Sequence, residues 1–447
     1  MHDDLATRVH DLFPSLTTML ADLVRIPSVS LTGYPPAEVR RSAEHLVAVL
    51  VETGFTNVGL LELDGAHPAV FGEIPGPEGA PTVLLYAHHD VQPPGPAEAW
   101  RTGPFDPFIE DGRMYGRGAS DDKAGIVMHL GAVATFDGAL PVGVKLFIEG
   151  EEEVGSAHLG EFLDRYSTLL AADVIVIGDS GNWRVGQPAL TTSLRGLVSC
   201  VVEVRTAENA VHSGMYGGVF PDALTTLARL LSTLHDDDGN VAIAGLVSEE
   251  SDPLDLTEDE VRQQMGTVPG LQQMGSGSIT GRMWTKPAIS VLSVDAPPIS
   301  EAINQLVPVA RAKVSMRIAP GQDPAAAMNA LRSHLLANVA WGADLTFLGQ
   351  EMGSAFHLAV SGPAPEAWKT AMQQVWGSDV VQMGIGGSIP FVADFSTRFP
   401  DAAILLTGPG DPTSAVHAPN ESQHLGDLEK SVLAEAIALR LLVARSS

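Results

Sequence analysis

The sequence predicts an α/β fold, in which helices flank a mainly parallel sheet and a smaller α+β domain is inserted into the chain. Short apolar runs of strand length lie at residues 81–87, 142–148 and 173–177, and helical patterns separate them. Each run is followed by histidine or carboxylate residues, and from about residue 192 the pattern changes to alternating apolar and polar residues. Strands separated by helices favour parallel pairing, whereas alternation is typical of antiparallel strands with one exposed face.

Outside the insertion, we expect helices and strands to alternate. Two amphipathic helices should surround the turn at residues 26–30, and the second should end at Gly54, because glycine commonly caps helix C-termini. The proline- and glycine-rich segment after residue 90 predicts a loop. The remaining expected elements are strands near 70–74 and at 403–408 and helices at 124–136, 366–376 and 428–443.

The insertion should combine half-exposed strands with amphipathic helices. Residues 197–204 and 313–318 alternate in polarity, and a polar, glycine-containing stretch at 248–285 predicts a long loop. The expected helices are 222–234 and 324–336. At 447 residues the chain is long for a single core. The predicted domain division is therefore 1–191 and 356–447 for the first domain and 192–355 for the insertion.

Composition excludes several classes of function. A formal net charge of −28 argues against nucleic-acid or anionic-membrane partners, since both need clustered Lys and Arg. The single cysteine, Cys200, excludes internal disulfides and thiolate zinc sites of the usual kind. No apolar run approaches the ~18 residues that a bilayer span needs, and the N-terminus lacks the pattern of a signal peptide. We expect a soluble, cytoplasmic protein.

Carboxylates and histidines recur where the predicted strands end, and once far downstream. Taken singly, each is weak evidence, because such residues usually hydrogen-bond within a core, cap a helix or face solvent. Several carboxylates at one sheet edge repel one another, however, and a bound cation would relieve that repulsion. The joint pattern is His88-x-Asp90, Gly118-x-x-Asp121-Asp122-Lys123, Glu149-Gly150-x-Glu152-Glu153, Gly178-Asp179 and Val416-His417-x-x-Asn420-Glu421.

With this pattern the chain resembles, across nearly its full length, the dinuclear metallopeptidase family of carnosinases, cytosolic dipeptidases, aminoacylases and succinyl-diaminopimelate desuccinylase. The motifs His-x-Asp-Val-Gln-Pro and Asp-Asp-Lys are most similar to those of the carnosinase and dipeptidase branch. The resemblance implies a catalytic domain with two divalent metal ions and an inserted lid and dimerisation domain. The implied metal ligands are His88, Asp121, Glu153, Asp179 and His417.

By the same resemblance, Asp121 bridges the two ions, His88 and Asp179 complete one position, and Glu153 and His417 complete the other. The peptide bond after Asp121 is expected to be cis. Zn²⁺ is the expected metal, and Mn²⁺ or Co²⁺ remains compatible, because imidazole and carboxylate ligands do not select one ion.

The resemblance also implies how the reaction proceeds. Asp90 would orient the His88 imidazole. Glu152 would be the general base that takes a proton from a water bridging the two metal ions, and the resulting hydroxide would attack an amide carbonyl. We interpret the neighbouring His89, Glu149 and Glu151 as structural.

The inserted domain and the last third of the chain carry further implied site residues. His212 resembles a family histidine that stabilises the oxyanion in the other subunit, which implies a homodimer through the inserted domain. Arg317 matches an arginine that holds the substrate's terminal carboxylate. Gly387 and Ser388 match a glycine-rich loop at the same end of the substrate. Where many dipeptidases carry an acid before this loop, the present chain has Ile385, which suits an apolar or blocked substrate residue.

Three functions remain open from the sequence. The first is a cytosolic dimeric metallopeptidase that hydrolyses dipeptides or short aminoacyl amides. The second is an N-acyl amino-acid deacylase, which the missing acid at residue 385 favours. The third is a metal-binding scaffold subunit without catalysis. Glu152 beside Glu153 argues against the third, because a scaffold has no physical need for a non-ligating base at that position.

Overall fold

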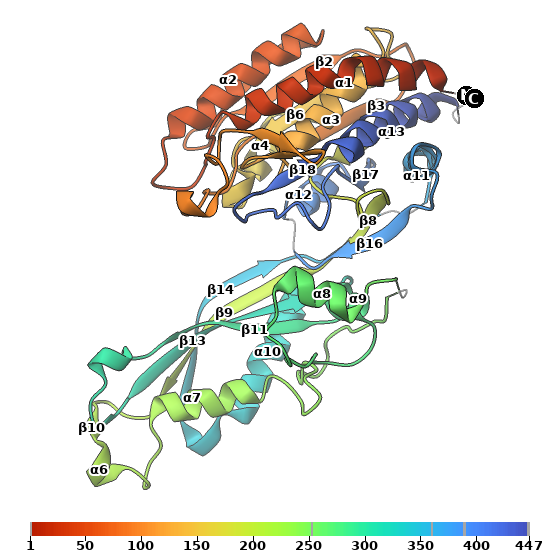
Figure 1. Ribbon diagram of the computed structural model, residues 1–447. Helices are drawn as coiled ribbons and strands as arrows, with labels where there is room; N and C mark the ends of the chain where they lie inside the picture. The colour runs from red at the N-terminus through yellow and green to blue at the C-terminus, as the bar shows by residue number, and fades with distance from the viewer. Residues whose placement is uncertain (1, 252–253, 359–360, 388–389, 445–447) are drawn as a thin grey trace. The chain divides into compact units, whose positions relative to one another are not determined.

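The computed structural model describes residues 2–251, 254–358, 361–387 and 390–444. The chain divides into two compact units (Figure 1). The first unit comprises Met1–Thr192, Leu358–Met383 and Pro390–Ser447, and the second comprises Ser193–His357 and Gly384–Ile389. None of the described helices is long and apolar enough to cross a membrane.

The first unit is built on a sheet with the strand order β1-β2-β6-β3-β7-β17-β8. The strands are β1 (Thr56–Leu61), β2 (Ala69–Ile74), β3 (Thr82–His88), β6 (Gly143–Glu149), β7 (Val174–Ile177), β8 (Ala189–Leu194) and β17 (Ala403–Leu406). The central strands β6, β3, β7 and β17 pair in parallel, and they are the apolar runs of the sequence, buried on both faces. The outer pairs β1–β2, β2–β6 and β17–β8 are antiparallel. The predicted mainly parallel sheet is therefore confirmed at its centre.

Helices cover both faces of this sheet (Figure 1). On one face, α1 (Asp3–Val24), α3 (Lys123–Ala134) and α13 (Leu425–Ala444) contact one another, and α11 (Pro363–Trp376) packs against α13. Residues 123–133 of α3 are all buried, which fits a helix that is apolar except for Lys123 and His129. Both polar side chains have hydrogen-bond partners in the core. At Gly131 a Cβ would lie 2.7 Å from Leu16 Cδ1, so glycine permits the close approach of α1. On the other face, Tyr86 of β3 stacks on Phe391 of α12 (Pro390–Arg398) with ring centroids 4.9 Å apart.

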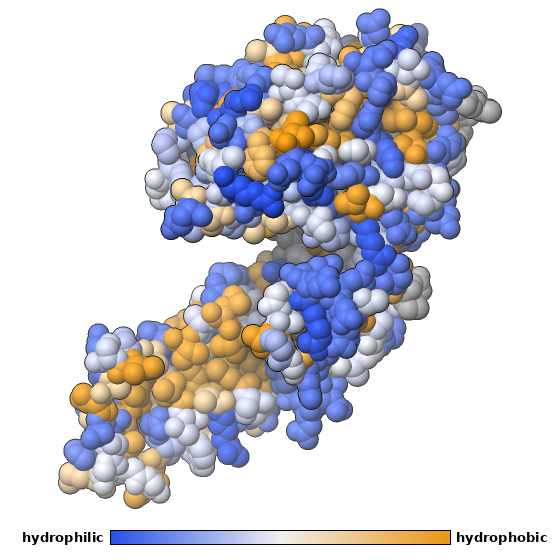
Figure 2. Space-filling model, viewed as in Figure 1, coloured by the Kyte–Doolittle hydropathy of each residue, from blue (hydrophilic) through white to orange (hydrophobic). Residues whose placement is uncertain are grey.

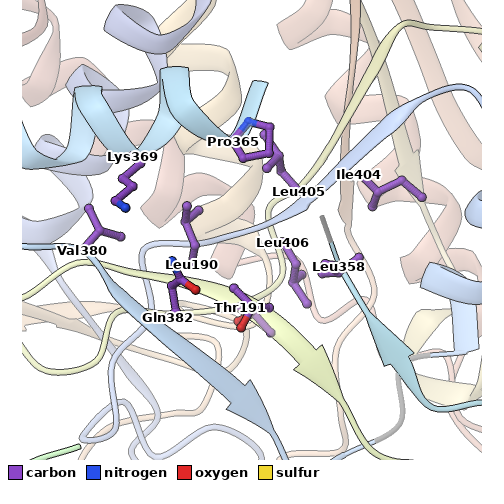
Figure 3. A pocket seen from close by; sticks show the side chains of 11 residues that line it. Leu190, Thr191, Leu358, Pro365, Lys369, Val380, Gln382, Ile404, Leu405 and Leu406 are labelled. Atoms are coloured by element: carbon purple, nitrogen blue, oxygen red, sulfur yellow. The ribbon is translucent and has the colours of Figure 1, made fainter. Parts of the chain in front are cut away.

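Smaller elements complete the first unit. They are α2 (Pro36–Glu52), α4 (Leu159–Arg165), α5 (Ser167–Leu170), the first three residues of β16 (Val381–Ile385) and a three-stranded sheet of β4 (Phe108–Glu110), β5 (Arg113–Tyr115) and β18 (Ser422–His424). A cavity of about 20 Å³ lies between α11 and the strands β8, β16 and β17, and residues such as Leu190, Lys369 and Leu405 line it (Figure 3). It has room for about one water molecule. None of the predicted metal ligands lines it, so it is a gap in packing rather than the predicted site.

The second unit contains an antiparallel four-stranded sheet with the order β11-β13-β9-β14. Its strands are β9 (Gly196–Arg205), β11 (Ala288–Asp295), β13 (Val309–Ile318) and β14 (Asp344–Gly353). Alternate residues of β13 are buried, from Ala310 to Ile318, in a core that they share with α7 (Ala223–Ser232) and α10 (Pro324–Asn338). The predicted half-exposed strands and both predicted helices are thus confirmed.

One prediction for this unit was wrong. The stretch 248–285, expected to be a long loop, contains α8 (Glu258–Met265) and α9 (Ile279–Trp284). A capping box begins α8, because the Thr257 side chain accepts from the Glu260 backbone while the Glu260 side chain accepts from the Thr257 backbone. No residue of α8 is buried, and Val261 and Met265 are its only apolar residues, too few to predict an amphipathic helix from the sequence. Other short elements of the unit are β10 (Val211–His212), α6 (Ser213–Tyr216), β12 (Gln305–Leu306) and β15 (Phe356–His357).

Candidate metal centre

The carboxyl ends of the parallel strands bring most of the predicted ligands together within the first unit. His88 is the last residue of β3, and Asp179 follows β7 by two residues. Asp121 lies two residues before α3, and its peptide bond to Asp122 is cis, as the resemblance implied. Glu153 belongs to a 3₁₀ turn at Glu152–Val154, just after β6. These positions share an edge because parallel strands point their carboxyl ends the same way.

Two imidazoles flank the Asp121 carboxylate. His88 Nε2 lies 3.0 Å from Asp121 Oδ1, and His417 Nε2 lies 2.8 Å from Asp121 Oδ2. His417 Nε2 also lies 3.2 Å from Glu153 Oε2. His417 comes from the loop between β17 and β18, where its backbone is left-handed with φ 64°. Asp121 therefore stands between two histidines that lie 329 positions apart in the chain.

Ligand atoms also gather in two groups of a size that could hold a metal ion. Within each group the atoms lie within 4.8 Å of one another, among the described residues. One group is His88, Asp121 and Glu153, and the other is His88, Glu152 and Asp179. The structure thus brings all five predicted ligands together, and it places the predicted base Glu152 beside them. Imidazole nitrogens with carboxylate oxygens fit divalent metal ions such as zinc or manganese.

The cluster crowds buried carboxylates together, and the pKa values of its members differ accordingly. Burial raises the pKa of Glu152 to about 9, and Asp179, Asp121 and Glu153 add like-charge repulsion. Burial, together with repulsion from Asp121, raises the pKa of Asp179 to about 7. Asp121 differs: although burial opposes it, the hydrogen bonds with His417 and His88 hold its pKa below the usual range. Divalent cations would offset this crowding of negative charge, so the residues fit the metal pair that the resemblance implied.

Asp90 connects the ligand on β3 to the turn after β6. Its carboxylate accepts hydrogen bonds from the backbone N–H of Glu152 at 3.1 Å and of Glu153 at 3.0 Å, and from Ser30 Oγ at 2.6 Å. His88 Nδ1 lies 3.1 Å from the Asp90 carbonyl oxygen and 3.4 Å from its Oδ1. Asp90 therefore contacts the His88 ring and also fixes the backbone that carries Glu152 and Glu153.

Glu421 has a position that the sequence did not reveal. Its Oε1 accepts from the backbone N–H of Ser120 at 2.9 Å and of Asp121 at 3.0 Å. Its Oε2 accepts from Arg117 Nη1 at 2.6 Å and from the Gly118 N–H at 3.0 Å. Glu421 thus fixes the segment that presents Asp121. The pattern His417-x-x-Asn420-Glu421 contained this residue, but its partners lie about 300 positions earlier, beyond any local signal.

The acids and histidine that we interpreted as structural make contacts away from the ligand atoms. Glu149 accepts a hydrogen bond from Tyr86 Oη at 2.6 Å. Glu151 accepts from the backbone N–H groups of His67 and His158, and His89 Nε2 lies 3.0 Å from the Pro68 carbonyl oxygen. These contacts tie the strand ends to neighbouring loops.

The predicted substrate residues lie in the second unit. His212 is exposed at the start of α6, and its Nδ1 accepts from the Gly214 N–H at 3.0 Å. Arg317 is half-buried on β13, where it pairs with Leu197 of β9, and burial lowers its pKa. Gly387 follows Gly386, whose carbonyl oxygen accepts from Arg195 Nε at 3.2 Å. Ser388 lies outside the described residues. The roles of these residues stay predictions.

The first unit thus combines an α/β fold with a cluster of carboxylates and imidazoles at the ends of parallel strands, and these are the ligand types of a divalent-metal centre. The profile of peptidase family M20/M25/M40 matches residues 84–440, a span that includes every predicted metal ligand. The chain belongs to this family, and it is a metal-dependent peptidase.

Relatives with assigned names support the same placement. The chain is 35% identical over 366 residues to a cysteinylglycine-S-conjugate dipeptidase of Corynebacterium striatum, with 80% of each chain covered. It is 26% identical to a Cys-Gly metallodipeptidase of Schizosaccharomyces pombe, with 93% of each covered. Its fold is similar to that of the solved dipeptidase Dug1p of Saccharomyces cerevisiae, with a TM-score of 0.80, 23% identity, and 99% and 98% of the two chains covered.

Proposed function

We propose that this peptidase hydrolyses dipeptides that have a free terminal carboxylate, with Glu152 as its general base. The observation that carries the proposal is the position of Glu152. Its carboxyl lies within 4.8 Å of the ligand atoms of His88 and Asp179, beside the five residues that the resemblance implies as ligands. The named relatives act on dipeptides, which favours this function over the N-acyl amino-acid deacylase.

The metal ions, when bound by His88, Asp121, Glu153, Asp179 and His417, supply Lewis-acid polarisation of the substrate carbonyl and lower the pKa of water. Glu152 takes a proton from the attacking water and delivers it to the leaving amine. The hydrogen bond from the Glu152 N–H to Asp90 fixes the backbone from which this carboxyl acts, and Asp90 also orients the His88 ring.

The substrate's carboxylate end is assigned to the second unit. Arg317 offers the planar fork of donors that matches a carboxylate, and the Gly387–Ser388 loop offers backbone N–H groups. We assign Zn²⁺ as the metal, with Mn²⁺ or Co²⁺ as alternatives that elemental analysis of the purified protein would distinguish. A cytoplasmic location is also proposed, because one buried cysteine suits a reducing compartment.

We further propose a homodimer through the second unit, in which His212 of each chain stabilises the oxyanion in the other. Figure 2 shows apolar side chains at the surface of this unit. The edge strand β11 exposes Val291, Leu292 and Val294 by 42%, 60% and 49%. Exposed apolar residues on an edge strand are typical of an interface. Mixing and re-associating His212→Asn and Asp90→Ala variants should recover activity, and recovery of none would remove support for the cross-subunit role.

The base assignment is tested by Glu152→Gln, with Glu161→Gln on the exposed surface of α4 as the matched control. Glu152→Gln should lower kcat on dipeptides by about 10²- to 10⁴-fold with its metal content intact, and the control should leave kcat unchanged. Hydrolysis by Glu152→Gln at the parent rate would show that another group is the base. A non-catalytic scaffold would instead give no hydrolysis by the parent protein.

The substrate assignment is tested with a matched panel of free dipeptides, including Cys-Gly, the same dipeptides N-acetylated, and N-acyl amino acids. Cleavage of the free dipeptides alone is expected. Preference for the acylated compounds would assign the protein to the deacylases and would make Ile385 a determinant of that preference.

A further inference from the structure

Gln92 is joined to Glu153 by three hydrogen bonds. Its backbone N–H donates to Glu153 Oε1 at 3.2 Å. Its side-chain Nε2 donates to Glu153 Oε2 at 2.8 Å and to the Glu153 carbonyl oxygen at 3.1 Å. Gln92 lies in the motif His-x-Asp-Val-Gln-Pro, and the reaction described above gives this residue no role.

Two of these bonds hold the Glu153 carboxylate itself, and the third holds its backbone carbonyl oxygen. The Glu153 side chain is 3% exposed, and its two oxygens have different donors on Gln92. The oxygen that faces the Gln92 amide, Oε2, is also the one 3.2 Å from His417 Nε2. Asp90 meanwhile holds the Glu153 N–H at 3.0 Å. The amide donor therefore selects the rotation of the carboxylate that aims Oε2 at the imidazole.

We propose that Gln92 is a positioning residue that sets the affinity of the metal position formed by Glu153 and His417. The proposal rests on the proposed function for the use of that position. An amide donor on one lone pair of Oε2 orients the oxygen so that another lone pair faces the cation. A donor is required there, because an acceptor on residue 92 would repel the Glu153 carboxylate.

Two variants distinguish the effect of the Gln92 hydrogen-bond donor from the effect of the volume that its side chain fills. Gln92→Met keeps an unbranched side chain of similar length and removes the donor. Gln92→Glu keeps the shape and replaces the donor by an acceptor. The matched control is Gln373→Met on α11, because Gln373 Nε2 also donates to a carboxylate, Asp379 Oδ1 at 3.3 Å, but in an exposed hydrogen bond far along the chain. Thermal unfolding of the metal-free proteins checks that each variant folds.

The measurement is a titration of the metal-free full-length protein with Zn²⁺, followed by calorimetry and by elemental analysis after gel filtration. The parent protein and Gln373→Met should bind two ions per chain. Gln92→Met should keep one position unchanged and weaken the other by about 10- to 100-fold, and Gln92→Glu should weaken it further. Activity of Gln92→Met should return when free metal is raised, with KM little changed, which a purely structural role would not produce.

Equal weakening of both positions, or two unchanged positions in Gln92→Met, would overturn the proposal. If Gln92→Met does not fold, Gln92→Glu decides in the same way, since its shape is that of the parent residue. Binding is measured without substrate, so the proposed dipeptidase function can fail on the substrate panel while this proposal stands, and the reverse also holds.

Discussion

Replacing Glu421 by alanine should cost the first unit a large part of its stability. Glu421 is fully buried, and its four donors are the backbone N–H groups of residues 118, 120 and 121 and the guanidinium of Arg117. Arg117 is 1% exposed, so Glu421→Ala leaves its charge buried without the carboxylate. Breaking a buried ion pair in this way costs about 3–5 kcal/mol, and the three amides that lose their acceptor favour the upper end of that range.

The assay is urea unfolding followed by far-UV circular dichroism, with Glu110→Ala as the matched control. Glu110 also pairs with an arginine, Arg101, but both side chains are about half exposed, and such pairs contribute less than about 1 kcal/mol. The double variant Arg117→Met with Glu421→Leu should be less destabilised than the sum of its single variants, because no buried charge remains unpaired. A loss below about 1 kcal/mol in Glu421→Ala, or strict additivity in the double variant, would refute the reasoning.

Three further predictions follow from the site and its surroundings. Burial raises the pKa of Glu149 from 4.5 to about 8, so the folded chain binds this proton more tightly than the unfolded chain. The contribution of this residue to the free energy of unfolding is full below about pH 4.5 and is lost as the pH rises through about 8. Urea unfolding at several pH values should show that Glu149→Gln removes this pH-dependent loss of stability. Gly386→Ala would place a Cβ 2.7 Å from Arg195 Nη2 and 3.0 Å from the Met283 carbonyl oxygen, and steady-state kinetics should show a raised KM with a smaller change in kcat. Dialysis against a chelator should abolish dipeptide hydrolysis, and restoring a divalent metal should recover it; activity that persists without metal would contradict the two-metal assignment.

The sequence was sufficient to predict the central strands of the first sheet and the residues that lie at the carboxyl ends of those strands. Strands buried on both faces are continuous apolar runs, so both their position and their ends are readable, and His88 and Asp179 follow those ends directly. The antiparallel pairing of β1, β2 and β8 was not readable, because strand direction depends on connections rather than on composition. Helix α8 was missed because it contains only two apolar residues, although the pair Thr257 and Glu260 offered the signal of a capping box.

Contacts between distant parts of the chain account for the rest of what was missed. Glu421 and the amides that it accepts from are separated by about 300 residues, and only the folded chain brings them together. Asp90 was expected to orient the His88 ring, but its bonds to the backbone of Glu152 and Glu153 depend on how β3 and β6 pair. The residue types of the centre can therefore be predicted from the sequence. The polar contacts that fix their positions can be found only from the folded structure.

The two-residue spacing of His88, Asp90 and Gln92 explains how the end of β3 contacts several parts of the centre. Val91 still bridges to Val29, so the chain remains extended past His88, and the alternate residues His88, Asp90 and Gln92 can share one face. Each of the three contacts a different part of the centre. His88 contacts the Asp121 carboxylate, Asp90 accepts a hydrogen bond from the backbone after β6, and Gln92 donates to the Glu153 carboxylate. A shift of one residue would turn all three side chains to the other face. The period of two in this extended segment therefore places all three side chains where they can contact the centre.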